Sequence, residues 1–252
     1  MTSASVEDYV KAIYVLQQEA RAGLDQPAGE GPAVSTSSLA ERMGVAAASV
    51  TSMMGRLSQV ELAMYTPYQG VRLTPAGEQV ALRVIRRHRL LELYLAEKLG
   101  LSWDQVHEEA ERLEHHISPT LEQRIADALG NPQVDPHGHP IPSAAGEVAP
   151  AVGTPLAVLD PGCPVIIRSV GDTDPELLRY LAAHGMVPGA TLTVTEREPF
   201  GGSLHVRVDG PDGSAECTLS LGAAARVRVV PSDELSGPAA GATGNSPNPL
   251  FV

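Results

Sequence analysis

One ten-residue stretch, HEEAERLEHH, gathers side chains that could bind a metal ion or move a proton. It holds three of the eight histidines in the chain, together with four glutamates. On a helix, which turns by about 100° per residue, Glu111, Glu114 and His115 share a face with His107, whereas His116 lies on the far side. The stretch could be a solvated acidic helix, the centre of a metalloenzyme or a metal sensor.

Spacing gives little support to the enzyme interpretation. A zincin helix needs His-Glu-x-x-His, but the position of the second histidine is Glu111. A di-iron bundle repeats Glu-x-x-His, and no acid stands three residues before His115 or His116. The sequence also has no Gly-x-Ser-x-Gly elbow and no Walker-type loop. A metalloenzyme that uses the Glu/His cluster therefore stays only an alternative.

Further candidate ligands lie outside this stretch, and each has a plainer explanation. His88 and Glu92 are four residues apart and share a helix face, as a surface pair also would. Asp8 falls in the first turn of a predicted helix, where the helix dipole alone favours an acid. His137 and His139, in DPHGHP, suggest a metal site, but the prolines and the glycine favour a turn.

Composition narrows the class of protein. The 252 residues carry a net charge of -12, which argues against a general nucleic-acid coat protein. The charge balance is about +3 over 51–100 and −7 over 101–150, which indicates an anionic partner and then a cationic one. We expect no transmembrane helix, no secretory signal and no disulfide, with Cys163 and Cys217 as buried thiols. A cytoplasmic protein is the simplest expectation.

Apolar spacing and capping residues predict the helices that must position these side chains. We expect Ser37 and Gly44 to bound a short helix, and Thr74, Ser102 and Ser118 to begin later ones. Two short strands around a Gln-Gly turn are predicted within 63–77. The other predicted helices cover 7–19, 45–62, about 75–99, 103–117 and 119–130.

The pattern changes after residue 130. The prolines of 131–142 exclude regular structure, and 143–155 is typical of a linker. Five short β-rich runs then surround a single helix at 174–185, which predicts a small β-barrel. We predict a loop at 21–33 and a disordered tail at 232–252.

The segment 35–73 has the form of a winged helix-turn-helix, with an ordinary helical hairpin as the alternative. Small side chains at the start of its second helix can approach base edges, and an arginine further along can reach a phosphate or a guanine. A helix rich in arginine follows at 83–89. The predicted DNA-binding residues are Ser37, Ala48, Ser49, Thr51, Ser52 and Arg56.

Taken together, SVEDYVKAIYVL, VAAASVTSMMGRL, RHRLLELYL, HEEAERLEHHIS and DPHGHPIP resemble the diphtheria toxin repressor/manganese transport regulator (DtxR/MntR) family. The resemblance implies an α+β fold of the three-domain type. It consists of a winged helix-turn-helix at 1–76, a helical metal-binding and dimerisation domain at 77–142, the linker 143–155, an SH3-like (FeoA-like) barrel at 156–231 and the tail 232–252.

The resemblance also implies two metal sites. The primary site would use Asp8, His88, Glu111, Glu114 and His115. The ancillary site would use His88, Glu92 and His107 with one barrel acid, for which the candidates are Asp172, Asp174 and Glu176. Oxygen donors at Asp8 and Glu111 favour Mn²⁺, with Fe²⁺ as the alternative. Lys11 stands where manganese members often carry a glutamate, so the number of ions stays open.

The function that the resemblance implies is a cytoplasmic homodimer that controls metal-homeostasis genes. It would bind palindromic, double-stranded operator DNA when loaded with Mn²⁺ or Fe²⁺, and would not be an enzyme or a membrane protein. Besides the metalloenzyme, the remaining alternative is a metal-independent winged-helix regulator that senses a small molecule through its barrel.

Overall fold

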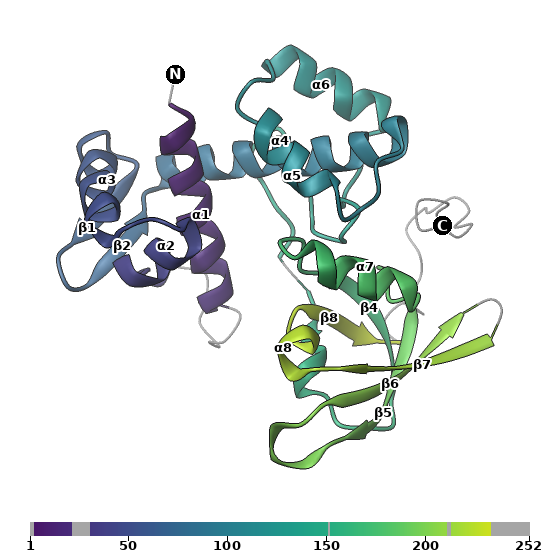
Figure 1. The fold of residues 1–252 in the computed structure, drawn as a ribbon. Helices are drawn as coiled ribbons and strands as arrows, with labels where there is room; N and C mark the ends of the chain where they lie inside the picture. Colours follow the sequence, from purple (N-terminus) through teal and green to yellow (C-terminus); the bar gives the residue numbers. More distant parts are fainter. Residues whose placement is uncertain (1–2, 22–30, 151, 211–212, 233–252) are drawn as a thin grey trace. The chain divides into compact units, whose positions relative to one another are not determined.

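The computed structural model describes residues 3–21, 31–150, 152–210 and 213–232 (Figure 1). Its internal contacts divide the chain into two compact units. Unit 1 comprises Met1–Arg87, Glu114–Ile117 and Pro142–Val148, and unit 2 comprises His88–Leu113, Ser118–Ile141 and Ala149–Val252. Most of the predicted loop and nearly all of the predicted tail lie outside the described residues.

Unit 1 contains the predicted helix-turn-helix and its wing. Its elements are α1 (Ala4–Arg21), α2 (Thr36–Met43), α3 (Ala47–Gln59), β1 (Ala63–Thr66), β2 (Gly70–Leu73) and the first half of α4 (Pro75–Leu99). The two strands form an antiparallel hairpin, and an isolated bridge joins Val34 to Val71. Apolar side chains from α1, α2 and α3, among them Ile13, Leu39 and Met54, form one core. The position of α3 therefore depends on how α1 packs against it.

Local capping confirms some of the predicted helix ends and corrects another. Gly44 ends α2 with φ 63, and Thr74 Oγ1 accepts a hydrogen bond from Gly77 N–H at the start of α4. The cap of α2 is Ser35, whose Oγ accepts from Ser38 N–H, so the prediction of Ser37 as the cap is wrong. Ser37 lies instead in the first turn of the helix, with an exposed side chain.

The helical part of unit 2 consists of the second half of α4, α5 (Val106–Leu113) and α6 (Pro119–Ala128). Ser118 caps α6 as predicted, and its Oγ accepts a hydrogen bond from Leu121 N–H. The predicted helix 103–117 is wrong at both ends. Trp103 is buried in the same core as the β-sheet residues and lies before the helix begins. The helix ends at Leu113. Ser102 consequently does not cap α5.

The β-rich part of unit 2 is one six-stranded antiparallel sheet, in the order β3-β8-β4-β5-β6-β7. Its strands are β3 (Thr154–Pro155), β4 (Pro164–Val170), β5 (Thr191–Arg197), β6 (Leu204–Gly210), β7 (Gly213–Leu219) and β8 (Val227–Pro231). The predicted helix is present as α7 (Pro175–Ala183), and short turns η1 (Leu156–Val158), η2 (Pro199–Gly201) and α8 (Leu221–Ala224) complete the fold. The sheet and α7 enclose one apolar core (Figure 1).

Two further expectations have different outcomes. Cys217 is buried on β7 as predicted, but Cys163 is exposed just before β4, so the prediction of a buried thiol there is wrong. None of the described helices is both long and apolar enough to cross a membrane.

Candidate metal centres and DNA-binding face

Three predicted ligands meet in unit 1 and form what we call centre 1: Asp8, Glu114 and His115. One possible ligand atom from each lies within 4.8 Å of the others. His115 Nε2 is 2.7 Å from Asp8 Oδ1 and 3.4 Å from Glu114 Oε1. Glu114 and His115 lie in the turn that follows α5, so their convergence does not come from a shared helix face.

Two neighbouring side chains complete the charge balance of centre 1. Lys11 Nζ lies 3.0 Å and 2.8 Å from the two carboxylate oxygens of Glu114, whose side chain is fully buried. Glu7 Oε2 is 2.7 Å from His115 Nδ1. Burial acts to lower the pKa of His115, but the hydrogen bond to Glu7 and the charges of Asp8 and Glu114 raise it overall. Sequence reasoning missed Glu7.

A second cluster in unit 2, which we call centre 2, contains His88, Glu92, His107 and Asp172. Glu92 Oε1 is 2.9 Å from His88 Nε2 and 3.2 Å from His107 Nδ1. The Glu92 side chain is fully buried, which acts to raise its pKa, yet the surrounding histidines hold that pKa well below its usual value. The helix spacing of His88 and Glu92 therefore does bring them together.

The structure distinguishes among the three candidate acids of the barrel. Asp172 lies in centre 2, in the loop between β4 and α7. Asp174 caps α7 by accepting a hydrogen bond from Leu177 N–H, and it also pairs with Arg226 at 3.0 Å. Glu176 is exposed in the first turn of α7. Neither Asp174 nor Glu176 belongs to a described cluster of possible metal ligands, so the geometry favours Asp172 as the barrel acid of centre 2.

The DPHGHP segment forms the turn that we predicted, but it also forms a third cluster of possible ligands. Asp135 Oδ1 accepts hydrogen bonds from the backbone N–H groups of His137 and His139. His137 Nε2 donates to the carbonyl oxygen of Trp103, so Nδ1 is the ring nitrogen that could bind a metal ion after it loses its proton. That Nδ1 lies 3.8 Å from Glu92 Oε1 in centre 2.

Buried polar atoms in and beside centre 2 lack hydrogen-bond partners among the described residues. They are Glu92 Oε2, Asp135 Oδ2, His137 Nδ1 and His139 Nδ1. Such atoms carry a desolvation cost of about 1–3 kcal/mol each unless something satisfies them. Carboxylate oxygens and imidazole nitrogens that share one buried space are suitable ligands for a divalent cation. The residues present therefore fit a metal ion.

The remaining predicted ligand, Glu111, lies in unit 2. Its Oε1 is 3.7 Å from His88 Nδ1 and 4.0 Å from His107 Nε2, and its side chain is 42% exposed. The five residues predicted for the primary site are thus divided between the two units. That they join in one set of ligands stays a prediction.

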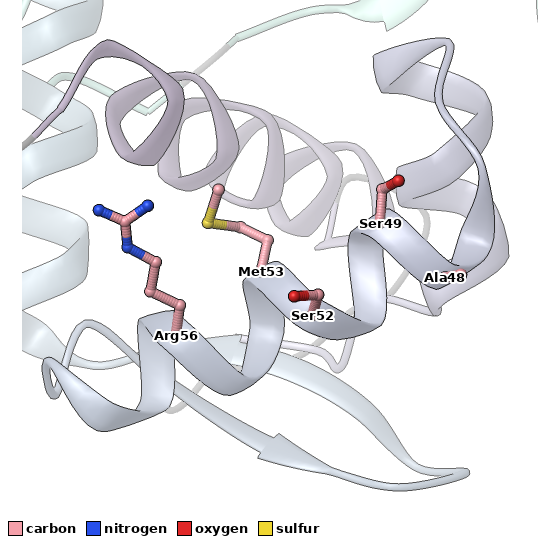
Figure 2. A pocket seen from close by; sticks show the side chains of 5 residues that line it. All are labelled: Ala48, Ser49, Ser52, Met53 and Arg56. Atoms are coloured by element: carbon pink, nitrogen blue, oxygen red, sulfur yellow. The ribbon is translucent and has the colours of Figure 1, made fainter.

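The exposed face of α3 carries most of the predicted DNA contacts. Figure 2 shows a shallow pocket along it, lined by Ala48, Ser49, Ser52, Met53 and Arg56. Thr51 is exposed at the edge of this face, and its hydroxyl donates to the Ala47 carbonyl. The opposite face buries Val50, Met54 and Leu57 in the core of unit 1. This amphipathic pattern leaves a stripe of small side chains and one arginine free to approach a partner.

The comparisons with known proteins cover almost the whole chain. Residues 1–71 match the family "Iron dependent repressor, N-terminal DNA binding domain", and residues 74–143 match "Iron dependent repressor, metal binding and dimerisation domain". Residues 154–231 match "FeoA domain". The iron-dependent repressor IdeR of Mycobacterium leprae is 32% identical over 214 residues, which is 80% of this chain and 88% of that protein.

The chain belongs to the iron-dependent repressor (DtxR/MntR) family. It is a metal-dependent DNA-binding regulator with a C-terminal FeoA domain of the SH3-like type. Another family member, the transcriptional regulator MntR of Bacillus pumilus, is 35% identical over 129 residues, which is 51% of this chain and 81% of that protein.

Solved structures of the DtxR/MntR family have the same fold. A manganese-dependent transcriptional repressor in complex with manganese is 38% identical, with a TM-score of 0.79, over 90% of this chain and 99% of that one. The manganese regulator SloR is 29% identical with a TM-score of 0.71, over 90% of this chain and 98% of that one.

Two arginines of α4 make contacts that the sequence analysis did not predict. Arg86 is buried and donates to the carbonyl oxygen of Pro142, and Arg89 donates to that of Pro140. These two side chains therefore stabilise the end of the DPHGHP segment and the residues just after it. The burial of a side chain depends on tertiary packing, so the count of basic residues alone could not show it.

Proposed function

We propose that this regulator binds palindromic operator DNA as a homodimer when centre 1 holds Mn²⁺, with Fe²⁺ as the alternative ion. The observation that carries the proposal is the convergence of Asp8, Glu114 and His115, two of which come from a segment distant in sequence from α1. A cation bound there would supply positive charge and a coordinate link between α1 and the turn after α5.

Donor chemistry supports manganese. Two carboxylates and one imidazole form a mostly hard donor set, and no described cluster of possible His, Cys, Asp and Glu ligands includes a cysteine. The identity to the manganese-bound repressor, at 38%, is higher than the 32% identity to the iron-dependent repressor of M. leprae. The donor set and the higher identity to the manganese-bound repressor both favour Mn²⁺ over Fe²⁺ for this chain.

The residues around centre 1 transmit its state through packing. Asp8 lies on α1 between residues that face the core, and Tyr9 and Ile13 of α1 share that core with Met54 of α3. Fixing α1 through Asp8 would therefore restrict the orientation of α3, the predicted recognition helix. In a homodimer, this restriction lowers the conformational cost of placing two such helices in successive major grooves.

For DNA recognition, we propose that the exposed face of α3 enters the major groove. Ala48, Ser49, Thr51 and Ser52 would approach base edges, and Arg56 and Ser37 would contact the phosphate backbone. The match to a dimerisation domain at 74–143 supports two half-sites about 10 base pairs apart, or a multiple of that spacing. The domain boundaries 1–76, 77–142 and 156–231, a cytoplasmic location and the absence of catalysis are parts of the same proposal.

We further propose that centre 2 holds a second ion that stabilises unit 2. His88, Glu92, His107 and Asp172 would bind it, and the nearby turn with His137 could add a ligand through Nδ1. The ion would compensate the buried negative charge of Glu92. Without an ion, Glu92 Oε1 alone contacts the imidazoles of His88 and His107.

Fluorescence anisotropy tests the proposal for centre 1. DNA selected by this protein from a random pool is titrated with full-length protein in Mn²⁺, in anaerobic Fe²⁺ and in chelator. We expect tight binding in Mn²⁺ and a loss of at least tenfold in chelator. His115→Ala should bind as the chelated protein does, whereas the adjacent, exposed His116→Ala should behave as the wild type. DNA affinity that is the same in Mn²⁺, in Fe²⁺ and in chelator would refute the proposal and favour a metal-independent regulator.

A further inference from the structure

Lys11 is one of only two lysines in the chain, and it lies in centre 1. Its ammonium group contacts both carboxylate oxygens of Glu114, at 3.0 Å and 2.8 Å. The Glu114 side chain is fully buried and that of Lys11 is 16% exposed. A buried carboxylate is unfavourable unless a charged partner compensates it, and Lys11 is that partner here.

The two oxygens of Glu114 have different surroundings. Oε1 is 3.4 Å from His115 Nε2, so it is the oxygen that belongs to the ligand cluster with Asp8. Oε2 makes the shorter contact with Lys11, at 2.8 Å. Glu114 can therefore offer Oε1 to a metal ion while Lys11 keeps Oε2. A second divalent ion next to Oε2 would have to take the place of the ammonium group.

We propose that Lys11 is a resident cation of centre 1 that limits the centre to one divalent ion and competes with that ion for the charge of Glu114. The inference rests on the proposed function, because it requires that centre 1 binds metal. A protonated ammonium has donors but no lone pair, so Lys11 cannot be a ligand while it is protonated. It acts instead as a residue that sets affinity and stoichiometry.

Charge alone predicts the direction of the effect. Centre 1 contains the carboxylates of Glu7, Asp8 and Glu114, against the positive charge of Lys11. Without Lys11, the ligand set becomes more negative and the repulsion between the ammonium and an incoming ion disappears. We expect Lys11→Met to bind Mn²⁺ at centre 1 at least tenfold more tightly, with the number of ions unchanged. Lys11→Glu adds a carboxylate ligand and should add one ion.

The experiment counts bound Mn²⁺ in full-length protein. Titrations are followed by the electron paramagnetic resonance signal of free Mn²⁺ and by calorimetry, for wild type, Lys11→Met, Lys11→Glu and His115→Ala. The matched control is Lys98→Met, because Lys98 is exposed near the end of α4 and pairs only weakly with its neighbour Glu97. If metal-free Lys11→Met does not fold, Lys11→Gln keeps a hydrogen-bond donor without the charge and should show the same gain in affinity.

The outcomes separate the two ideas. Tighter binding in Lys11→Met or Lys11→Gln, one extra ion in Lys11→Glu and no change in Lys98→Met would support the inference. Unchanged affinity in the neutral variants would overturn the role of Lys11 and leave the proposed function intact. The same would follow if wild type bound two ions at centre 1 and His115→Ala bound neither of them. If His115→Ala bound as many ions as wild type with the same affinities, both proposals would fail.

Discussion

Gly138 should be essential for the turn that carries His137 and His139. Its φ is 86°, in the left-handed region, and a Cβ built on it would lie 2.1 Å from the backbone oxygen of Arg168 in β4. The turn also contacts β4 through a hydrogen bond from Val170 N–H to the His137 carbonyl oxygen. Gly138→Ala must therefore strain the backbone and also push the turn away from β4.

The free-energy cost of Gly138→Ala to the folded state has two parts. A left-handed conformation costs an L-residue about 1–2 kcal/mol. Forcing a methyl group into a filled space adds about 1–3 kcal/mol, and neither contacting group is the flexible end of a side chain. Gly130 is a matched control, because its φ is 73° but a Cβ there meets no atom within 4 Å. Gly130→Ala should therefore cost only the first part.

Thermal unfolding and Mn²⁺ calorimetry test this reasoning. We expect Gly138→Ala to unfold about 2–12 °C below Gly130→Ala, since 1 kcal/mol corresponds to about 2–4 °C for a protein of this size. Affinity at centre 2 should fall at least tenfold in Gly138→Ala, because His137 moves away from Glu92. Equal stability and equal metal binding in the two variants would show that the close approach to β4 does not constrain the turn.

Three further predictions follow from single groups. Ser35→Ala should destabilise unit 1 by about 1 kcal/mol in urea unfolding, whereas Ser37→Ala should stay within about 0.5 kcal/mol; the reverse order would restore Ser37 as the cap. Arg56→Ala should lower the slope of log K against log salt by about 1 for DNA binding, and an unchanged slope would exclude a phosphate contact. Burial acts to lower the pKa of His137, but Glu92 and other nearby acids raise it to about 9. Metal-free protein should therefore lose on the order of 3 kcal/mol of stability between about pH 6.5 and 9, as that proton leaves; a flat profile in chelator would contradict this.

Local signals were sufficient to predict much of the fold. Gly44, Thr74 and Ser118 mark helix ends because they act on their own backbone within a few residues. The helix predicted at 103–117 is wrong because tertiary packing overrides the local pattern. Trp103 is only 3% exposed, in the apolar core under the sheet of unit 2, and because it is buried there α5 begins only at Val106. A single sequence carries no signal for that long-range contact.

The candidate sites show the same division. Spacing alone could group His88 with Glu92, because four residues separate them on one helix. Spacing could not choose Asp172 over Asp174, since the choice depends on a loop that the sheet positions. Nor could it show that Asp135 and the DPHGHP histidines make a ligand cluster beside Glu92 while still forming the predicted turn.

The two centres also differ in what satisfies their carboxylates without metal. In centre 1, Lys11 holds both oxygens of Glu114, and both ring nitrogens of His115 face acids. In centre 2, one oxygen of Glu92 serves two histidines while the other has no hydrogen-bond partner among the described residues. An ion entering centre 1 must therefore compete with the fixed charge of the Lys11 ammonium, whereas an ion entering centre 2 displaces at most the exchangeable proton of His137 and gains the unpartnered oxygen of Glu92. We expect centre 2 to fill at the lower metal concentration, which would leave centre 1 as the site whose occupancy follows changes in metal supply. Loading of centre 1 at the lower concentration in the Mn²⁺ titration would refute this order.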